Sequence, residues 1–335
     1  MSQLIAIKLG SSNTSIYKQG EGLVLFEPSL VAYTGDDQAR TVLAVGSGAK
    51  KMQGRTEESI EVVSPIKEGR IINPELATAM LKTYLSRVIP SFIFKPRIKA
   101  VVCVPLGVSS KEKKLIELVC NTAGVQDAII IPAIMAGAAG YNLPISEPEG
   151  LCLVNIGGGS TDIAIVSVNS VISGLNIGIG GKSMDAAIED AIKEVYNIEI
   201  GAGVAESIKE EIGSLYVRDA SNTEVSGIDL VSGLAKSVVV EASVIYGAIV
   251  GLYDRIADGI LAAIKECPPN IVEDVQNRGV FMMGGASLIT GAEQYFRRRL
   301  NLPVIIQDQT TAVDVLGAGK LLAEPKLIKE MSNLI

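Results

Sequence analysis

Two short stretches of the sequence have the residue types and the spacing to bind an anion. Residues 7–16, IKLGSSNTSI, match residues 154–163, VNIGGGSTDI, position by position: apolar residues, a turn of glycines and hydroxyl residues, and a second strand-like run. Such turns let successive backbone N–H groups point into one concavity, which is an anion site. One example alone is more often an ordinary tight hairpin. Two related examples, each opening about half of the chain, favour a duplicated domain whose facing hairpins grip a polyphosphate.

We expect the turn residues themselves to contact the phosphates. They are Gly10, Ser11, Ser12 and Asn13 in the first turn, and Gly157, Gly158, Gly159, Ser160 and Thr161 in the second. Lys8 and Asn155 occupy matching places, each two residues before the first glycine of its turn.

Two further segments fit a nucleotide site. The predicted helix VAESIKEEIG places Glu206 and Lys209 three residues apart on one face, where both can reach one ligand; an exposed ion pair is the alternative. Gly284, Gly285 and Ala286 follow a buried strand and precede a helix, which permits a flat ligand to approach the backbone and helix N–H groups.

The segment NIGIGGKS, residues 176–183, is one residue short of a P-loop, because Asn176 stands in place of the first glycine. A P-loop would leave the two matched hairpins without a purpose. We therefore expect this segment to pack at the start of the helix SMDAAIEDAIKEVYN.

Composition excludes several other functions. The chain has 335 residues, enough for two domains, and it contains no histidine, so catalysis or metal binding by histidine is excluded. Its four cysteines are scattered in apolar surroundings, which indicates core residues of a reducing cytoplasm. A net charge of −7 argues against nucleic acid as a partner. We expect neither a membrane span nor a signal peptide, and we expect residues 242–253 to form a buried helix.

The motifs along the chain resemble those of the superfamily that contains actin, the Hsp70 ATPase domain and the sugar kinases. Within it the chain is similar to MreB, the bacterial actin, along nearly its whole length. The segments that carry this resemblance are GEGLVLFEPSLVAY, AVGSGAKKMQGRT, PIKEGRIINPELATAMLK, VPLGVSSKEKKLIELVCNTAG, NLPISEPEG, NIGGGSTDIAIVS, IGGKSMDAAI and LNLPVIIQDQTTAVDVLGAGKLL.

The resemblance implies an α/β, actin-like fold. Two duplicated domains with RNase H-like, five-stranded mixed sheets, each with an inserted subdomain, are expected to enclose a central nucleotide cleft. Domain I is predicted at 1–143, with its insert at about 32–74 and a return of the chain at 320–335. Domain II is predicted at 144–319, with its insert at about 182–240. The family also implies ATP in the cleft and head-to-tail filaments of paired protofilaments on the inner face of the membrane.

The chain departs from the family at three acidic positions of the cleft. Lys8 and Asn155 stand where the two hairpins of the family begin with aspartate, and Ala133 stands where it has the glutamate that orients the attacking water. Mg²⁺ is held through carboxylates and phosphates, so we expect any magnesium to be held weakly. Loss of a water-positioning group costs about two to four orders of magnitude in rate, which predicts slow or negligible hydrolysis. Thr161 keeps a hydroxyl that leaves room for residual activity.

Two interpretations of Lys8 remain open. Its ammonium group either faces the phosphates and takes over part of the neutralising role of magnesium, or pairs with a neighbouring carboxylate such as Asp162.

A membrane contact is predicted in the segment RVIPSFIFKPRIK, residues 87–99. Phe92, Ile93 and Phe94 lie there between basic residues in an expected loop, and exposed apolar clusters beside lysine and arginine suit an anionic membrane. The alternative is that these side chains fold back into a core.

The leading function is a cytoskeletal filament subunit that binds ATP and acts in cell shape or motility. Its expected partners are copies of itself, paralogous filament subunits and the inner membrane surface. A small-molecule kinase of the same superfamily is the alternative, although Lys8, Asn155 and Ala133 argue against it.

Overall fold

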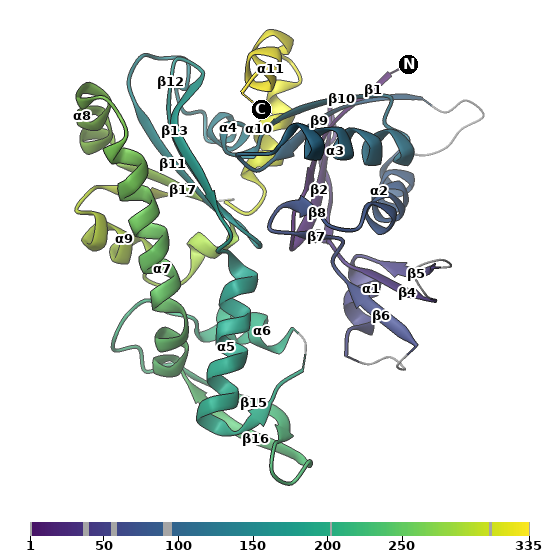
Figure 1. Cartoon of the computed structure of the whole chain (residues 1–335), viewed down its shortest axis with the longest axis vertical. Helices are drawn as coiled ribbons and strands as arrows, with labels where there is room; N and C mark the ends of the chain where they lie inside the picture. Colours follow the sequence, from purple (N-terminus) through teal and green to yellow (C-terminus); the bar gives the residue numbers. More distant parts are fainter. Residues whose placement is uncertain are drawn as a thin grey trace.

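The computed structural model describes residues 2–35, 40–54, 59–89, 96–201, 203–307 and 310–334. Two lobes stand side by side, each built on one five-stranded sheet and each extended downward in Figure 1 by a smaller insert. We call the lobe with the first sheet lobe 1 and the lobe with the second sheet lobe 2. This arrangement confirms the predicted actin-like architecture of two similar α/β halves.

The sheet of lobe 1 has the strand order β10-β9-β1-β2-β3. β1 and β2 form the first predicted hairpin, in which Leu9 pairs with Thr14, while β9 runs parallel to β1. The strands are β1 (Ser2–Leu9), β2 (Asn13–Lys18), β3 (Gly22–Pro28), β9 (Arg97–Val104) and β10 (Asp127–Pro132). The helices around it are α2 (Pro74–Val88), α3 (Ser110–Ala123), α4 (Ala133–Gly140), α10 (Val313–Leu321) and α11 (Pro325–Ser332).

The insert of lobe 1 is a small sheet of order β5-β4-β6 with one short helix. Its elements are β4 (Val31–Thr34), β5 (Thr41–Val45), α1 (Ser47–Met52) and β6 (Ile60–Val63), followed by the two-stranded β7 (Ile66–Lys67) and β8 (Arg70–Ile71).

Lobe 2 repeats the plan with the strand order β13-β12-β11-β17-β18. Its hairpin of β11 and β12 pairs Ile156 with Thr161, as Leu9 pairs with Thr14 in lobe 1. The strands are β11 (Leu151–Ile156), β12 (Thr161–Ser167), β13 (Ser170–Ile177), β17 (Val280–Met283) and β18 (Val304–Ile306). The helices are α7 (Ala242–Lys265), α8 (Pro269–Arg278), the 3₁₀ helix η1 (Gly285–Leu288) and α9 (Ala292–Leu300).

The insert of lobe 2 joins two helices to a sheet of order β14-β15-β16. It comprises α5 (Gly181–Tyr196), β14 (Ile198–Glu199), α6 (Val204–Ile212), β15 (Asn222–Asp229) and β16 (Ala235–Glu241).

Local signals explain where several helices begin and end. Ser109 caps α3 by accepting a hydrogen bond from the backbone of Glu112, whose side chain accepts from Ser109 in return, and Gly124 ends the helix in the left-handed conformation. The expected buried helix at residues 242–253 is the first half of α7. Among the described residues, no helix is long and apolar enough to cross a membrane.

A shared apolar core holds the two lobes together at their base. It contains Ala6 and Val101 from the first sheet and Leu153 and Ala164 from the second. The helices α4 and α10 pack closely within this region, which the absence of a side chain at Gly317 allows. A β-carbon there would collide with the carbonyl oxygen of Ala136. α10 also contacts β1 and β2, so the chain touches the first sheet again before residue 320. This packing fixes the floor of the space between the lobes.

Candidate functional site

A cavity of about 460 Å³ lies between the lobes, within the size range of small-molecule sites. Both predicted turns reach it, as do the three residues that follow β17. The residues that line it are Lys8, Gly10, Ser11, Ser12, Asn13, Ser15, Phe26, Gly157, Gly158, Gly181, Glu206, Lys209, Glu210, Tyr253, Gly284, Gly285, Ala286, Leu288, Ile289, Thr290 and Thr311.

The two turns have the same backbone geometry. The N–H group of Gly10 donates to the carbonyl of Asn13 over 3.1 Å, and that of Gly157 donates to Ser160 over 2.9 Å. The next two N–H groups of each turn, those of Ser11, Ser12, Gly158 and Gly159, donate to no group among the described residues. Unpaired N–H groups of consecutive residues can bind the oxygens of a phosphate.

The turns also touch each other across the cavity. A β-carbon at Gly158 would lie 2.1 Å from the Ser12 hydroxyl oxygen, and one at Gly159 would lie 2.3 Å from that of Ser11. Glycine is required at both positions because of this approach. It explains two of the three successive glycines of the second turn, Gly158 and Gly159.

The segment that resembles a P-loop supports the second turn. Gly181 donates its backbone N–H to Gly157 over 2.9 Å, and Lys182 donates to Gly158 over 2.7 Å. The expected packing role at a helix start therefore agrees with the geometry, although α5 begins at Gly181, two residues before the expected serine.

Lys8 points from β1 to the floor of the cavity, where it forms an ion pair with Asp314 of α10. Burial alone would lower the pKa of Lys8, but the Asp314 carboxylate outweighs it and raises that pKa, so the ammonium group stays charged. Lys8 therefore pairs with a carboxylate, as one of the two interpretations expected, but the partner is Asp314 and not Asp162.

Asp162 instead ties the lobes together. Its Oδ1 accepts a hydrogen bond from the backbone N–H of Leu106 over 2.9 Å and another from Asn176 Nδ2 over 2.8 Å. Burial raises the pKa of this carboxyl group to about 6, although both hydrogen bonds act in the opposite direction.

The altered acidic positions supply no carboxylate to the cavity. The side chain of Asn155 is buried and its Oδ1 has no hydrogen-bond partner among the described residues. Ala133 is buried at the start of α4.

Three residues of the second turn lie differently from the prediction. Gly159, Ser160 and Thr161 are not among the residues that line the cavity. Gly159 packs against Ser11, and Thr161 is fully buried with its hydroxyl donating to the carbonyl of Ile179 over 2.7 Å. The proton of that hydroxyl is therefore engaged, and its oxygen is left only as an acceptor.

The residues at the cavity floor do not fit a magnesium site. A lysine and an amide stand at positions 8 and 155, Asn155 is not among the residues that line the cavity, and the nearby Asp314 carboxylate is already paired with Lys8. Within the described ranges, no group of three or more acidic or cysteine side chains gathers closely enough to hold a metal ion.

Two further segments that the sequence singled out also line the cavity. Glu206 and Lys209 both line it, as their spacing on α6 predicts, and each also has an acidic or basic partner: Lys50 for Glu206, Asp185 for Lys209. The turn of Gly284, Gly285 and Ala286 is present, but it leads into the 3₁₀ helix η1, and α9 starts only at Ala292.

Sequence reasoning missed the apolar residues that line the cavity. Tyr253 of α7, with Leu288 and Ile289 after β17, lines the cavity, and the Tyr253 hydroxyl donates to the carbonyl of Ala286 over 2.6 Å. Phe26 of β3 lines the opposite side and is 44% exposed. Apolar residues carry no local motif, so the sequence offered no signal that would distinguish them from the core. The predicted membrane residues Phe92, Ile93 and Phe94 lie outside the described residues.

Comparisons with known proteins agree with one another. The sequence model of the family described as MreB/Mbl protein matches residues 2–330. The cell shape-determining protein MreB of Escherichia coli K12 is 34% identical over 321 residues, which cover 95% of this chain and 92% of that protein. The cell shape-determining protein Mbl of Bacillus subtilis 168 is 33% identical, with 95% of each chain covered.

Solved structures give the same result. The crystal structure of MreB5 of Spiroplasma citri bound to AMPPNP has a TM-score of 0.90 and 29% identity, and the match covers 100% of this chain and 99% of that one. The MamK double helical filament, at 20% identity and a TM-score of 0.80 over 97% and 99% of the two chains, shares the fold.

Proposed function

The chain belongs to the MreB/Mbl family of bacterial actin homologues, and from that premise we propose that it is a filament-forming cytoskeletal subunit that binds ATP between its lobes. We further propose that it acts in cell shape or motility and hydrolyses ATP slowly. The observation that carries the proposal is the pair of matched turns, from which Ser11, Ser12 and Gly158 line one cavity with backbone N–H groups that have no partner among the described residues. The related MreB5 of Spiroplasma citri was crystallised with AMPPNP and with ADP, which supports a nucleotide in the same place.

Slow hydrolysis follows from what the site lacks. Hydrolysis of a phosphoanhydride needs a positioned water and neutralisation of the charge that develops on the phosphates. Ala133 cannot orient a water, and the hydroxyl of Thr161 is already bonded to Ile179. The ATP would then act mainly as a structural ligand that holds the lobes together.

Lys8 would supply part of the neutralising charge. Its ammonium group has three donors, of which Asp314 occupies one, and the residue lines the cavity on the side of the turns. We infer that the phosphates bind beside this charge and depend little on magnesium.

The affinity for a non-hydrolysable ATP analogue, measured with Mg²⁺ and with a chelator, tests this inference. We expect less than about a threefold difference for the wild type and a clear gain in magnesium dependence for Lys8→Asp, because a carboxylate restores a ligand for the metal. An unchanged metal dependence in Lys8→Asp would show that Lys8 does not take this role. Absence of analogue binding to the wild type would remove the proposed function itself.

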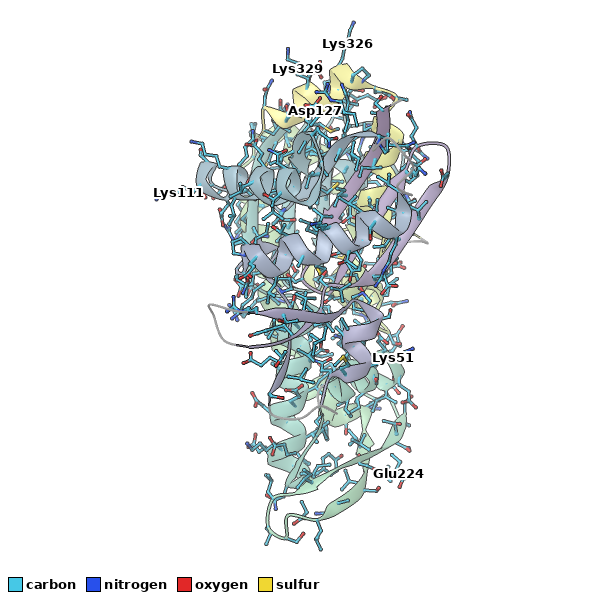
Figure 2. The ribbon with its side chains drawn as sticks, turned by 90° about the vertical axis from the view of Figure 1, so that its right-hand side faces the viewer. Lys51, Lys111, Asp127, Glu224, Lys326 and Lys329 are labelled. Carbon is cyan, nitrogen blue, oxygen red and sulfur yellow. The ribbon has the colours of Figure 1, made fainter. Side chains whose placement is uncertain are left out.

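We propose that lobe 1 faces the inner surface of the membrane. Residues 144–319 contain 23 acidic and 11 basic residues, whereas the remaining residues contain 14 acidic and 19 basic ones. Figure 2 shows Lys111 on α3, and Lys326 and Lys329 on α11, extending from the side of lobe 1. These exposed cations would attract anionic lipids, and Phe92, Ile93 and Phe94 would insert. We also propose paralogous filament subunits as partners.

The kinase alternative is not favoured. The matched relatives are cell shape-determining proteins, and Lys8, Ala133 and Asn155 supply neither a carboxylate for a metal nor an acid to activate an acceptor hydroxyl.

A further inference from the structure

An ion pair joins the two inserts across the cavity. Lys50 Nζ, at the end of α1 in lobe 1, lies 2.7 Å from Glu206 Oε2, in the first turn of α6 in lobe 2. The two helices face each other across the gap between the inserts in Figure 1. Of the ion pairs that the structure gives for its described residues, no other links these two subdomains. The inserts cannot separate without breaking it.

Glu206 takes part in two sites at once. It lines the cavity, whereas Lys50 does not, so its carboxylate lies between the ligand space and the cation of the opposite lobe. A carboxylate accepts hydrogen bonds at both oxygens, and Lys50 occupies only Oε2. A ligand hydroxyl group can therefore bind Glu206 while the ion pair remains intact.

We propose that Lys50 and Glu206 form a latch that slows the entry and the exit of the nucleotide. The inference rests on the proposed function, because it concerns exchange at the same cavity. Opening the inserts breaks the ion pair in the transition state for release, while the closed complex keeps it. Both side chains are partly exposed, at 49% for Lys50 and 33% for Glu206. An exposed pair of this kind changes a rate by about two- to fivefold.

Stopped-flow displacement of a fluorescent ATP analogue by excess ATP tests the latch in Lys50→Ala. The neighbouring Lys51→Ala is the matched control, because Lys51 is exposed on the same helix and has no ion-pair partner among the described residues. Lys50→Arg retains the charge. We expect release to be about two- to fivefold faster in Lys50→Ala and unchanged in the other two variants. Salt should speed release from the wild type and have little effect on Lys50→Ala, since it screens an exposed pair.

The possible outcomes distinguish failure of the latch from failure of the proposed nucleotide site. Equal release rates for the wild type and Lys50→Ala, with binding intact, would overturn the latch and leave the proposed function standing. Absence of analogue binding in the wild type would overturn both. Equally fast release in Lys51→Ala would show a general effect of charge on the insert, which also contradicts the latch.

Discussion

At the residue scale, an ion pair between two side chains balances the charges at the cavity floor. A buried carboxylate is costly unless a cation or a metal compensates it. In this chain Asp314 is only 3% exposed, and the partner that compensates it is Lys8, from a segment 306 positions away. The pair keeps the Lys8 ammonium group charged at the cavity that the two matched turns line.

Substitutions of Lys8 and Asp314 test whether each charge compensates the burial of the other. We expect Lys8→Met to lower the free energy of unfolding by about 3 kcal/mol, because it leaves Asp314 buried without a partner. The double variant Lys8→Met, Asp314→Val should recover most of that loss, since apolar side chains of similar size often replace a buried pair at little cost. Urea unfolding of the wild type, both single variants and the double variant measures the coupling. Strictly additive losses would contradict the pairing.

The sequence predicted the type of chemistry at this floor but not the contacts. Lys8 and Asn155 stood out because the family that the sequence resembles has aspartate at both positions. Asp314 did not, because its position opposite Lys8 depends on how α10 packs against β1. Thr161 illustrates the same limit: its hydroxyl matched a binding motif, and nothing in the sequence indicates that it donates to the carbonyl of Ile179, just before α5.

At the element scale, two hairpins set the geometry of the whole site. Each turn is closed by the same hydrogen bond between its first glycine and the residue three positions later. Local signals of this kind were readable from the sequence, as were the capped start of α3 and its glycine stop. The 3₁₀ helix after β17 was not, because Ala286 within it accepts a hydrogen bond from the distant Tyr253, a tertiary contact with no local sequence signal.

The close approach of the hairpins predicts the effect of one methyl group. Gly159→Ala places a carbon within 2.6 Å of Ser11 Cβ, so the two turns must move apart. We expect affinity for an ATP analogue to fall at least about tenfold, the equivalent of 1.4 kcal/mol at the low end of overpacking costs. Isothermal titration calorimetry measures it.

The control for this variant is Gly251→Ala in α7, where an added β-carbon meets nothing within 4 Å. It should leave nucleotide affinity unchanged and raise stability by up to about 1 kcal/mol, because alanine favours the helix. Unaltered affinity in Gly159→Ala would show that the turns tolerate separation and do not grip the ligand together.

At the scale of the whole molecule, the lobes share an apolar base but differ in charge. The base contains side chains from both sheets, so opening is expected between the inserts and not at the base. The basic excess outside residues 144–319 is the basis of our proposal that lobe 1 faces an anionic surface.

Membrane contact is testable with vesicles that contain anionic lipid. The double variant Phe92→Ser, Phe94→Ser should lose most of its co-sedimentation, because it removes the apolar anchor and leaves electrostatic attraction alone. The double variant Val231→Ser, Leu234→Ser is the control, since it removes exposed apolar side chains from the insert of lobe 2. Equal sedimentation of the wild type and the phenylalanine variant would contradict membrane insertion.

The most direct test of the central claim is to follow polymer and phosphate in one sample. Purified protein is incubated with ATP, pelleted at intervals and assayed for released phosphate, with negative-stain images of the pellet. The account predicts ATP-dependent filaments while phosphate release stays about two to four orders of magnitude below that of an MreB with its acidic residues intact. A soluble subunit with steady turnover, or filaments indifferent to adenine nucleotides, would contradict it.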